Sequence, residues 1–234
     1  MAFPSLLGGH YNGAMAEADL SELYGKGLAQ QQAGQAKAAL QIYNVVLKRG
    51  WRDAAIFVRC GECWEALGDL ARADEAYGRA IVLDPELDQA RRRAAALALR
   101  ARDLALKVGH AEAAEELRRG AVQYLAGLGE RCLMRGAFAE AEAVFRDAAR
   151  LAPGDWGVRV DLGRCLYEQG RYEAAEKAIR DGLGLAPEAA LGHFHLGVLL
   201  GRQGRRAEAE AALRHALILD PALAAAGAAL AQLG

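Results

Sequence analysis

The sequence predicts an all-α chain of helix-turn-helix repeats that stack as a solenoid. Three observations predict this fold class. Small residues recur every 34 residues, a glycine follows most of them at a fixed spacing, and four of the five prolines share one place in the same period. The stretch from Ala54 to Leu87 shows the pattern most clearly. A period of this length indicates supersecondary units that each contact mainly their neighbours.

Each recurring residue has a steric reason. With Ala54 counted as the first position of a repeat, small residues at the eighth and twentieth positions let two helices approach closely. They are Gly27, Gly61, Ala95, Gly129, Gly163 and Gly197 at the eighth position, and Ala39, Ala73, Ala141, Ala175 and Ala209 at the twentieth. Larger residues at the twenty-fourth position are expected to fill the space beside them: Tyr43, Tyr77, Phe145, Ile179 and Leu213.

Glycine and proline mark the predicted helix ends. Glycine at the fifteenth position predicts the end of each first helix, where the backbone needs a positive φ. These glycines are Gly34, Gly68, Gly136, Gly170 and Gly204. Proline predicts the end of each second helix, because it cannot continue the hydrogen-bond ladder. These prolines are Pro85, Pro153, Pro187 and Pro221. Asp84 and Asp220 precede two of them, which suits a turn.

The combined pattern resembles the tetratricopeptide repeat, a helix-turn-helix unit of 34 residues. The resemblance implies a right-handed superhelical solenoid. It covers six blocks: 20–53, 54–87, 88–121, 122–155, 156–189 and 190–223. The pentatricopeptide repeat, a related RNA-binding unit, matches less well in period and signature.

The first part of the chain is the loosest match. Segment 1–19 is predicted to be partly flexible, because Pro4 and two adjacent glycines interrupt it. Asn12 is a candidate cap for a helix that begins near Gly13. The second helix of the first block is predicted over 35–48.

Block 88–121 is degenerate, because Arg91, Arg102 and Lys107 stand at its fourth, fifteenth and twentieth positions. We expect one long helix over 87–107, a turn at 108–110 and a short second helix over 111–119. The basic residues of this block are Arg91, Arg92, Arg93, Arg100, Arg102 and Lys107. They predict either a solvated helix face, offset by Glu112, Glu115 and Glu116, or a site for an anionic partner; the solvated face is the commoner case. The block is also a candidate hinge.

Blocks 122–223 are regular, and Glu140 and Glu142 on a second helix are expected to face solvent. Segment 224–234 predicts a C-terminal capping helix whose one polar side chain is Gln232. Terminal helices of solenoids usually need a polar outer face. We therefore expect either that another surface covers this helix, as in a homo-oligomer, or that the chain is the recognition module of a larger enzyme or regulator.

Composition and charge argue against several classes of protein. The formal net charge of −1 argues against bulk attraction to nucleic acid or to an anionic membrane. Charged residues interrupt the apolar stretches, so no transmembrane span is predicted. Residues 1–10 lack lysine and arginine and do not resemble a secretory signal. The expected location is cytoplasmic, and the high content of alanine, arginine and glycine suggests a bacterial source.

No catalytic residue, cofactor or metal site is predicted. Cys60 and Cys63 form a CxxC pair, but both fall inside a predicted helix and no second pair follows. Buried structural thiols are therefore expected, rather than a redox or zinc site. His193 and His195 lie two residues apart, which places them on different sides of a helix.

The resemblance implies a concave groove, lined by the first helices, that binds an extended peptide or a helix of a partner protein. The implied lining is Tyr24, Leu28, Val58, Arg59, Glu62, Glu65, Arg92, Arg93, Arg100, Glu130, Met134, Val160, Asp161, Arg164, Tyr167, Glu168, Phe194, His195, Val198 and Arg202. The candidate partner contacts among them are Tyr24, Arg59, Glu62, Arg92, Arg93, Arg100, Glu130, Arg164, Tyr167, Phe194, His195 and Arg202. Arginines are expected to bind carboxylates and aromatic residues to act as anchors.

One binding mode of the family is not expected. Some tetratricopeptide co-chaperones grip a C-terminal carboxylate with lysine, asparagine and arginine residues at set positions. Those positions carry Tyr24, Leu28, Arg59, Gln89 and Arg93 from the first block, and Ala126, Glu130, Asp161, Leu191 and His195 from the fourth. The expected function is therefore a non-enzymatic scaffold or adaptor with a protein partner. A module of a larger enzyme or regulator and a self-assembling structural protein are the alternatives.

Overall fold

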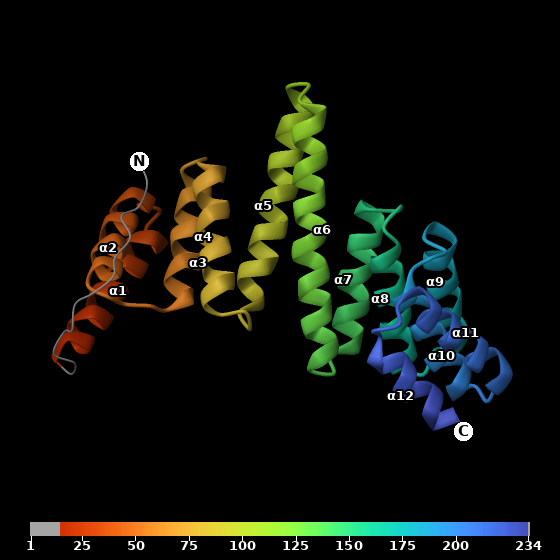
Figure 1. The fold of residues 1–234 in the computed structure, drawn as a ribbon. Helices are drawn as coiled ribbons and strands as arrows, with labels where there is room; N and C mark the ends of the chain where they lie inside the picture. The colour runs from red at the N-terminus through yellow and green to blue at the C-terminus, as the bar shows by residue number, and fades with distance from the viewer. Residues whose placement is uncertain (1–14, 234) are drawn as a thin grey trace. The chain divides into compact units, whose positions relative to one another are not determined.

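The computed structural model describes residues 15–233, and this part of the chain consists of twelve helices without a strand (Figure 1). None of these helices is both long and apolar enough to cross a membrane. The all-α prediction is confirmed, while the expectations for residues 1–14 lie outside the described part. The helices are α1 (Met15–Gln32), α2 (Ala36–Lys48), α3 (Ala54–Ala66), α4 (Leu70–Leu83), α5 (Asp88–Lys107), α6 (Ala111–Met134), α7 (Phe138–Leu151), α8 (Trp156–Glu168), α9 (Tyr172–Leu185), α10 (Ala190–Arg202), α11 (Arg206–Leu219) and α12 (Ala224–Leu233).

The predicted hairpins form, and glycine makes their turns. The paired helices are α1 with α2, α3 with α4, α6 with α7, α8 with α9, and α10 with α11. The fifteenth-position glycine of each pair has a φ between 74° and 80°. Any residue with a Cβ atom is strained in this left-handed region, so the predicted role of these glycines is confirmed.

A large side chain fills the space that each eighth-position glycine leaves. A Cβ atom on Gly61 would lie 2.5 Å from Cε1 of Tyr77, whose side chain is fully buried. A Cβ atom on Gly129 would lie 2.7 Å from Cζ of Phe145. The other pairs of this kind are Gly27 with Tyr43, Gly163 with Ile179, and Gly197 with Leu213. The predicted close approach of the two helices is therefore confirmed in each regular block.

Proline ends the second helices as predicted. Helices α4, α7, α9 and α11 each stop two residues before a proline. The side chain of Asp84 accepts a hydrogen bond from the backbone N–H of Glu86 at 2.8 Å. Asp220 accepts one from the backbone N–H of Ala222 at 3.0 Å. These aspartates close the turns around their prolines, as expected from their place before proline.

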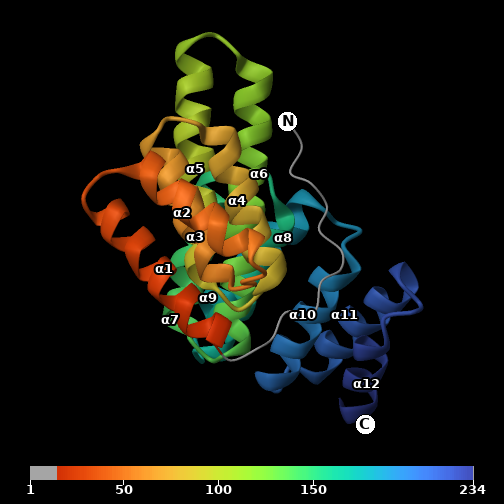
Figure 2. The same ribbon diagram turned by 90° about the vertical axis from the view of Figure 1, so that its left-hand side faces the viewer.

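Block 88–121 departs from the prediction in its second half. Helix α5 and the turn at Gly109, with a φ of 80°, are as expected. The next helix does not stop at Arg119, however: α6 continues to Met134 and merges with the first helix of the following block. Figure 1 shows α6 as one unbroken helix, and Figure 2 shows the turn that joins it to α5.

The merging has a local cause. Arg119 stands where the regular blocks have proline, and arginine continues a helix that proline would stop. Gly120 follows inside the helix, where glycine costs only about 1 kcal/mol relative to alanine. The expected short helix over 111–119 is therefore wrong.

The chain divides into two compact units, Met1–Ala90 and Arg91–Gly234, and each has its own core. In the first unit, Tyr43, Ile56 and Cys63 belong to one buried cluster. In the second unit, successive clusters contain Phe145, Leu199 and Leu213, and consecutive clusters draw on shared helices. The core of this unit thus continues from repeat to repeat, as expected for a solenoid.

Glu142 corrects the expectation that both acids on this second helix face solvent. Its side chain is buried, and its carboxylate accepts hydrogen bonds from Arg171 at 2.8 Å and Gln169 at 2.9 Å. Glu140 is more exposed and pairs with Arg135 at 3.0 Å. Arg146 of the same helix also lies 2.7 Å from this carboxylate. The sequence pattern of α7 alone could not show the burial, because Gln169 and Arg171 belong to the next repeat.

The same contact recurs one block later. Arg171, at the start of α9, binds Glu142 of α7, and Arg205, at the start of α11, lies 2.7 Å from Glu176 of α9. Burial raises the pKa of both carboxyl groups, but hydrogen bonds and the neighbouring arginine charges lower it by more, so each pKa lies below its ordinary value. These bonds join consecutive second helices of the C-terminal unit.

Helix α12 covers the end of the last hairpin. Leu230 and Leu233 lie against the cluster formed with α10 and α11. The exposed residues of α12 are Ala224, Ala225, Ala228, Ala231 and Gln232. The leucines of this helix therefore pack against the chain's own core. Self-assembly through α12 stays a prediction.

Candidate functional site

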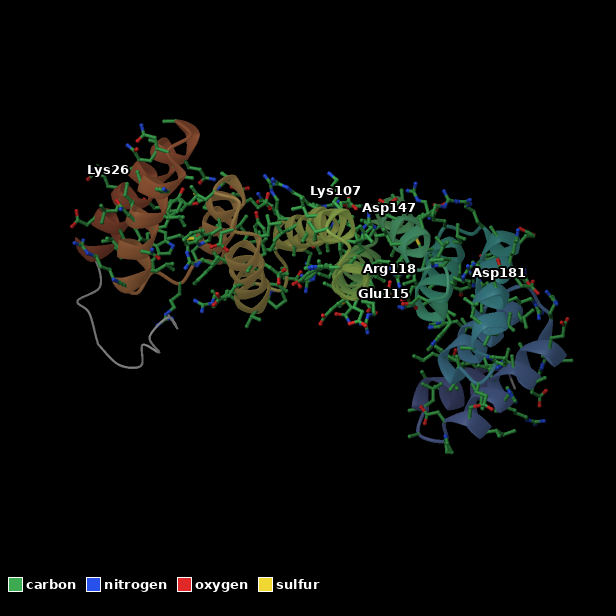
Figure 3. The ribbon with its side chains drawn as sticks, turned by 90° about the horizontal axis from the view of Figure 1, so that it is seen from above. Lys26, Lys107, Glu115, Arg118, Asp147 and Asp181 are labelled. Carbon is green, nitrogen blue, oxygen red and sulfur yellow. The ribbon has the colours of Figure 1, made fainter. Side chains whose placement is uncertain are left out.

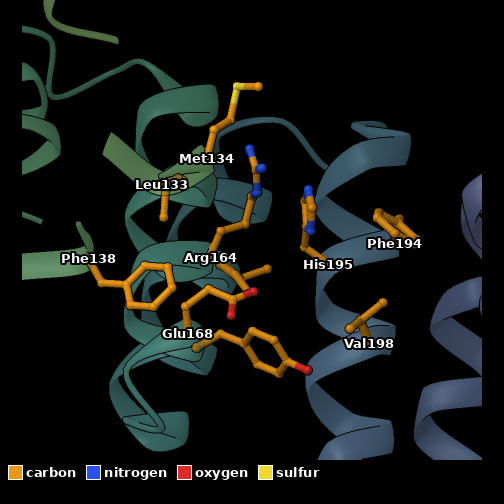
Figure 4. Close-up of a pocket in the computed structure, with 10 residues that line it drawn as sticks. Leu133, Met134, Phe138, Arg164, Glu168, Phe194, His195 and Val198 are labelled. Atoms are coloured by element: carbon orange, nitrogen blue, oxygen red, sulfur yellow. The ribbon is translucent and has the colours of Figure 1, made fainter. Parts of the chain in front are cut away.

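A cavity of 430 Å³ lies among helices of the C-terminal unit. Its walls are mostly apolar, with a few polar groups, which is typical of recognition sites. Figure 4 shows Arg164 and Glu168 on one side of it and His195 and Val198 on the other. The lining is Leu133 and Met134 of α6, Phe138 of α7, Arg164, Tyr167 and Glu168 of α8, Ile179 of α9, and Phe194, His195 and Val198 of α10.

The repeat period places most of these side chains. Equivalent positions of neighbouring first helices come close together, so Arg164 and Val198, both at the ninth position, line the same cavity. The cavity contains four of the candidate contacts: Arg164, Tyr167, Phe194 and His195. It also contains three residues of the wider predicted lining: Met134, Glu168 and Val198.

Three lining residues were missed by the sequence reasoning. Leu133 stands at the twelfth position, like Tyr167, and that equivalence could have found it. Phe138 and Ile179 belong to second helices, which were not expected to contribute. Only the packing of α7 and α9 behind the first helices brings these two side chains to the cavity.

Arg164 is engaged by two carboxylates. Its Nη1 atom lies 2.9 Å from Oδ1 of Asp161 and 3.6 Å from Oε1 of Glu130. The second contact joins α8 to α6. Burial raises the pKa of Asp161, and the charge and hydrogen bond of Arg164 offset this effect only in part. Glu130 and Arg164, both candidate contacts, therefore act as one ion-paired group at the cavity.

His195 is a neutral group in this cavity. Burial, and then the positive charge of Arg164, lower its pKa to about 3. A neutral imidazole offers one hydrogen-bond donor and one acceptor. Arg202 lies outside the lining, and a hydrogen bond with Tyr172 raises its pKa.

The N-terminal unit brings together three more candidates: Tyr24, Arg59 and Glu62. Arg59 Nη1 lies 3.0 Å from Oε2 of Glu62, and Nε2 of Gln31 donates to the same oxygen at 2.8 Å. The ring of Tyr24 is stacked on Trp51, with centroids 5.9 Å apart and 17° between the planes. The polar groups of Arg59 and Glu62 are thus already hydrogen-bonded to each other.

The remaining candidates, Arg92, Arg93 and Arg100, are exposed on α5. Arg92 forms an ion pair with Glu140 of α7. Nε of Arg118 donates a hydrogen bond to Oε2 of Glu115, on the same helix α6, at 2.8 Å. Figure 3 labels these two side chains next to each other. The glutamate at 115 therefore offsets an arginine of α6, not the basic residues of α5.

The four cysteines are free and buried. Burial raises the pKa of Cys60 to about 12 and that of Cys63 to about 11. A thiol with such a pKa stays protonated at neutral pH, which agrees with the predicted structural role. Within residues 15–233, no three histidine, cysteine or acidic side chains are arranged to hold a metal ion.

Known families identify the class of this chain. A model described as tetratricopeptide repeat matches residues 133–195, and a second with the same description matches residues 191–223. These matches show tetratricopeptide repeats over residues 133–223. The helical hairpins and their small-to-large packing extend the same repeat pattern toward the N-terminus. No curated protein matches the sequence.

Solved structures share the fold at low sequence identity. The assembly chaperone of RpL4 (Acl4) aligns with a TM-score of 0.51 and 18% identity, over 92% of this chain and 95% of that chain. YrrB, a TPR protein with an unusual peptide-binding site, aligns with a TM-score of 0.46 and 18% identity, over 80% and 96%. The Arabidopsis OM64 TPR domain aligns with a TM-score of 0.47 and 19% identity, over 50% and 96%. At these identities the likeness concerns the fold alone.

Proposed function

We propose that the chain is a non-enzymatic scaffold or adaptor that binds a peptide or helical segment of a partner protein in the cavity between α6, α8 and α10. The tetratricopeptide repeat fold supports a protein-interaction scaffold in general terms. The cavity itself is the observation that carries the more specific proposal, because most of its lining comes from the first helices, whose face binds partners elsewhere in this class of repeat.

The size and lining of the cavity suit side chains of a peptide. Its volume of 430 Å³ falls in the range of about 300–1,000 Å³ that is typical of ligand sites. Met134 at its edge is 84% exposed, although it is a large apolar residue. A partner that covers Met134 and inserts apolar side chains beside Val198 and Phe138 would remove this surface from water, which favours association.

Peptide display against the immobilised protein tests the proposal. Val198→Arg would place a long charged side chain in the cavity, whereas Ala143→Arg is a matched change at an exposed position of α7. We expect selected peptides to bind the wild type and the Ala143→Arg variant and to be lost from Val198→Arg. Circular dichroism must show that both variants fold. Selection of no peptide, or equal binding by both variants, would disprove the proposed site.

We also propose a cytoplasmic location. The support is that all four cysteines are free thiols, since reduced cysteines are the rule in the cytosol. Fractionation of the source cells, with an antibody against the chain, would measure this directly.

A further inference from the structure

The charges around the cavity differ from the arginine-rich lining expected of it. Among the described residues that line the cavity, Arg164 is the one cationic side chain. Its guanidinium already lies within 4 Å of the carboxylates of Asp161 and Glu130. A carboxylate from a partner would therefore approach two like charges together with one opposite charge. Like-charge contacts of this kind oppose binding.

The other basic group of the lining does not change this balance. The ring of His195 is neutral at physiological pH, because burial and the charge of Arg164 hold its pKa far below neutrality. Arg202 does not line the cavity and is bonded to Tyr172 instead. The cavity thus offers no unneutralised cation to an acidic ligand among its described side chains.

Glu168 is a negatively charged side chain of the cavity that no cation in the described part of the chain neutralises. It lines the cavity, is exposed, and forms no ion pair or hydrogen bond with any residue in the described range 15–233. Two other glutamates of this unit, Glu142 and Glu176, are instead each held by arginines. Figure 4 shows the carboxylate of Glu168 directed into the space between α8 and α10. It is therefore an unpaired carboxylate of the cavity that is available to a cationic group of a partner.

An aromatic ring and apolar side chains line the same cavity as this carboxylate. They are Tyr167, which is the preceding residue, and Leu133, Phe138 and Val198. A carboxylate beside an aromatic face favours a lysine or arginine, through an ion pair and a cation–π contact. The apolar walls can bury a neighbouring aliphatic or aromatic side chain of the same ligand.

We propose that the occupant of this cavity is a peptide segment that places a lysine or arginine against Glu168 and Tyr167 and an adjacent apolar side chain against Phe138 and Val198. This inference rests on the proposed function, because it specifies the ligand class of the same site. It excludes an acidic segment or a free C-terminal carboxylate as the main recognition element.

Three displayed peptide libraries test the ligand class. Each has randomised apolar residues around one central residue, which is arginine in the first library, glutamate in the second and unrestricted in the third. The immobilised proteins are the wild type, Glu168→Lys, Glu168→Gln and, as a matched control, Glu173→Lys at an exposed site on α9. Binding of selected peptides is then measured at two salt concentrations, since exposed ion pairs weaken as salt rises.

We expect the arginine library to bind the wild type about two- to fivefold better than the glutamate library, as for an ion pair with an exposed carboxylate. Glu168→Gln should remove this preference, Glu168→Lys should reverse it, and Glu173→Lys should leave it unchanged. A preference of the wild type for the glutamate library would overturn this inference while leaving the peptide site in place. An equal preference in wild type and Glu168→Lys would also overturn it. If no library binds, the proposed function fails and this inference fails with it.

Discussion

Replacing Gly61 by alanine tests the packing on which each regular hairpin depends. Gly61 of α3 faces Tyr77 of α4, and a Cβ atom there would lie 2.5 Å from Cε1 and 2.8 Å from Cζ of the ring. The ring is fully buried, and its hydroxyl group donates a hydrogen bond to Oε1 of Glu65 at 2.8 Å. Because the ring is rigid and held at both ends, it cannot move away without disturbing α4.

Two effects of the substitution oppose each other. Alanine favours a helix over glycine by about 1 kcal/mol. Overpacking a core costs about 1–3 kcal/mol, and so short a contact with a rigid ring places the cost near the upper end. We therefore expect Gly61→Ala to lower the free energy of unfolding by about 2 kcal/mol. Gly78 of α4 is the matched control, because no atom lies within 4 Å of its Cβ position. Gly78→Ala should stabilise the chain by about 0.5–1 kcal/mol.

Urea unfolding followed by circular dichroism measures both effects. The midpoint and the slope should be compared, since a changed slope would indicate that one unit unfolds separately. If Gly61→Ala is as stable as the wild type, the close approach does not require glycine and the steric reasoning fails. If Gly78→Ala is destabilised equally, the loss at Gly61 cannot be assigned to the tyrosine ring.

Three further predictions follow from buried or repeat-breaking residues. Glu142→Gln should lower stability in urea by about 1–2 kcal/mol, because Arg171 loses its buried carboxylate partner, whereas the exposed Glu173→Gln should change it by less than about 0.5 kcal/mol. The folded pKa of Glu142 lies below its ordinary value, so its contribution to stability is present above the unfolded pKa of about 4.3 and is lost as pH falls through the folded pKa. The free energy of unfolding of Glu142→Gln should therefore fall less steeply with acid than that of the wild type. An equally steep fall would refute this assignment. Cys60, whose pKa is raised to about 12, should react with a thiol reagent only after urea is added, and prompt labelling of the folded protein would contradict its burial. Arg119→Pro should lower the free energy of unfolding by about 3 kcal/mol, because α6 is continuous at this residue. Thermal unfolding measures the effect, and an unchanged melting temperature would show that the helix tolerates a break there.

The repeat positions predict part of the candidate site. Arg164, Tyr167, Phe194 and His195 were named from repeat positions, and they line one cavity because a constant period brings equivalent positions of neighbouring helices together. Their chemistry was not predictable in the same way. Arg164 is neutralised partly by Glu130, which stands at the same ninth position one block earlier. The period brings these two side chains near each other, but only the structure shows that they form an ion pair and that Asp161 binds the same guanidinium group.

The sequence by itself determined the hairpins, their glycine turns, their proline ends and the pairs such as Gly61 with Tyr77. Each of these depends on a local property of one residue type, namely backbone freedom, a missing N–H group or side-chain size. The tertiary structure alone decided which charges are buried, as at Glu142, and which remain available, as at Glu168. It also decided that α6 runs through two blocks. Electrostatic partners and helix continuity depend on contacts between repeats, and the free energy of those contacts is not contained in any single period of the sequence.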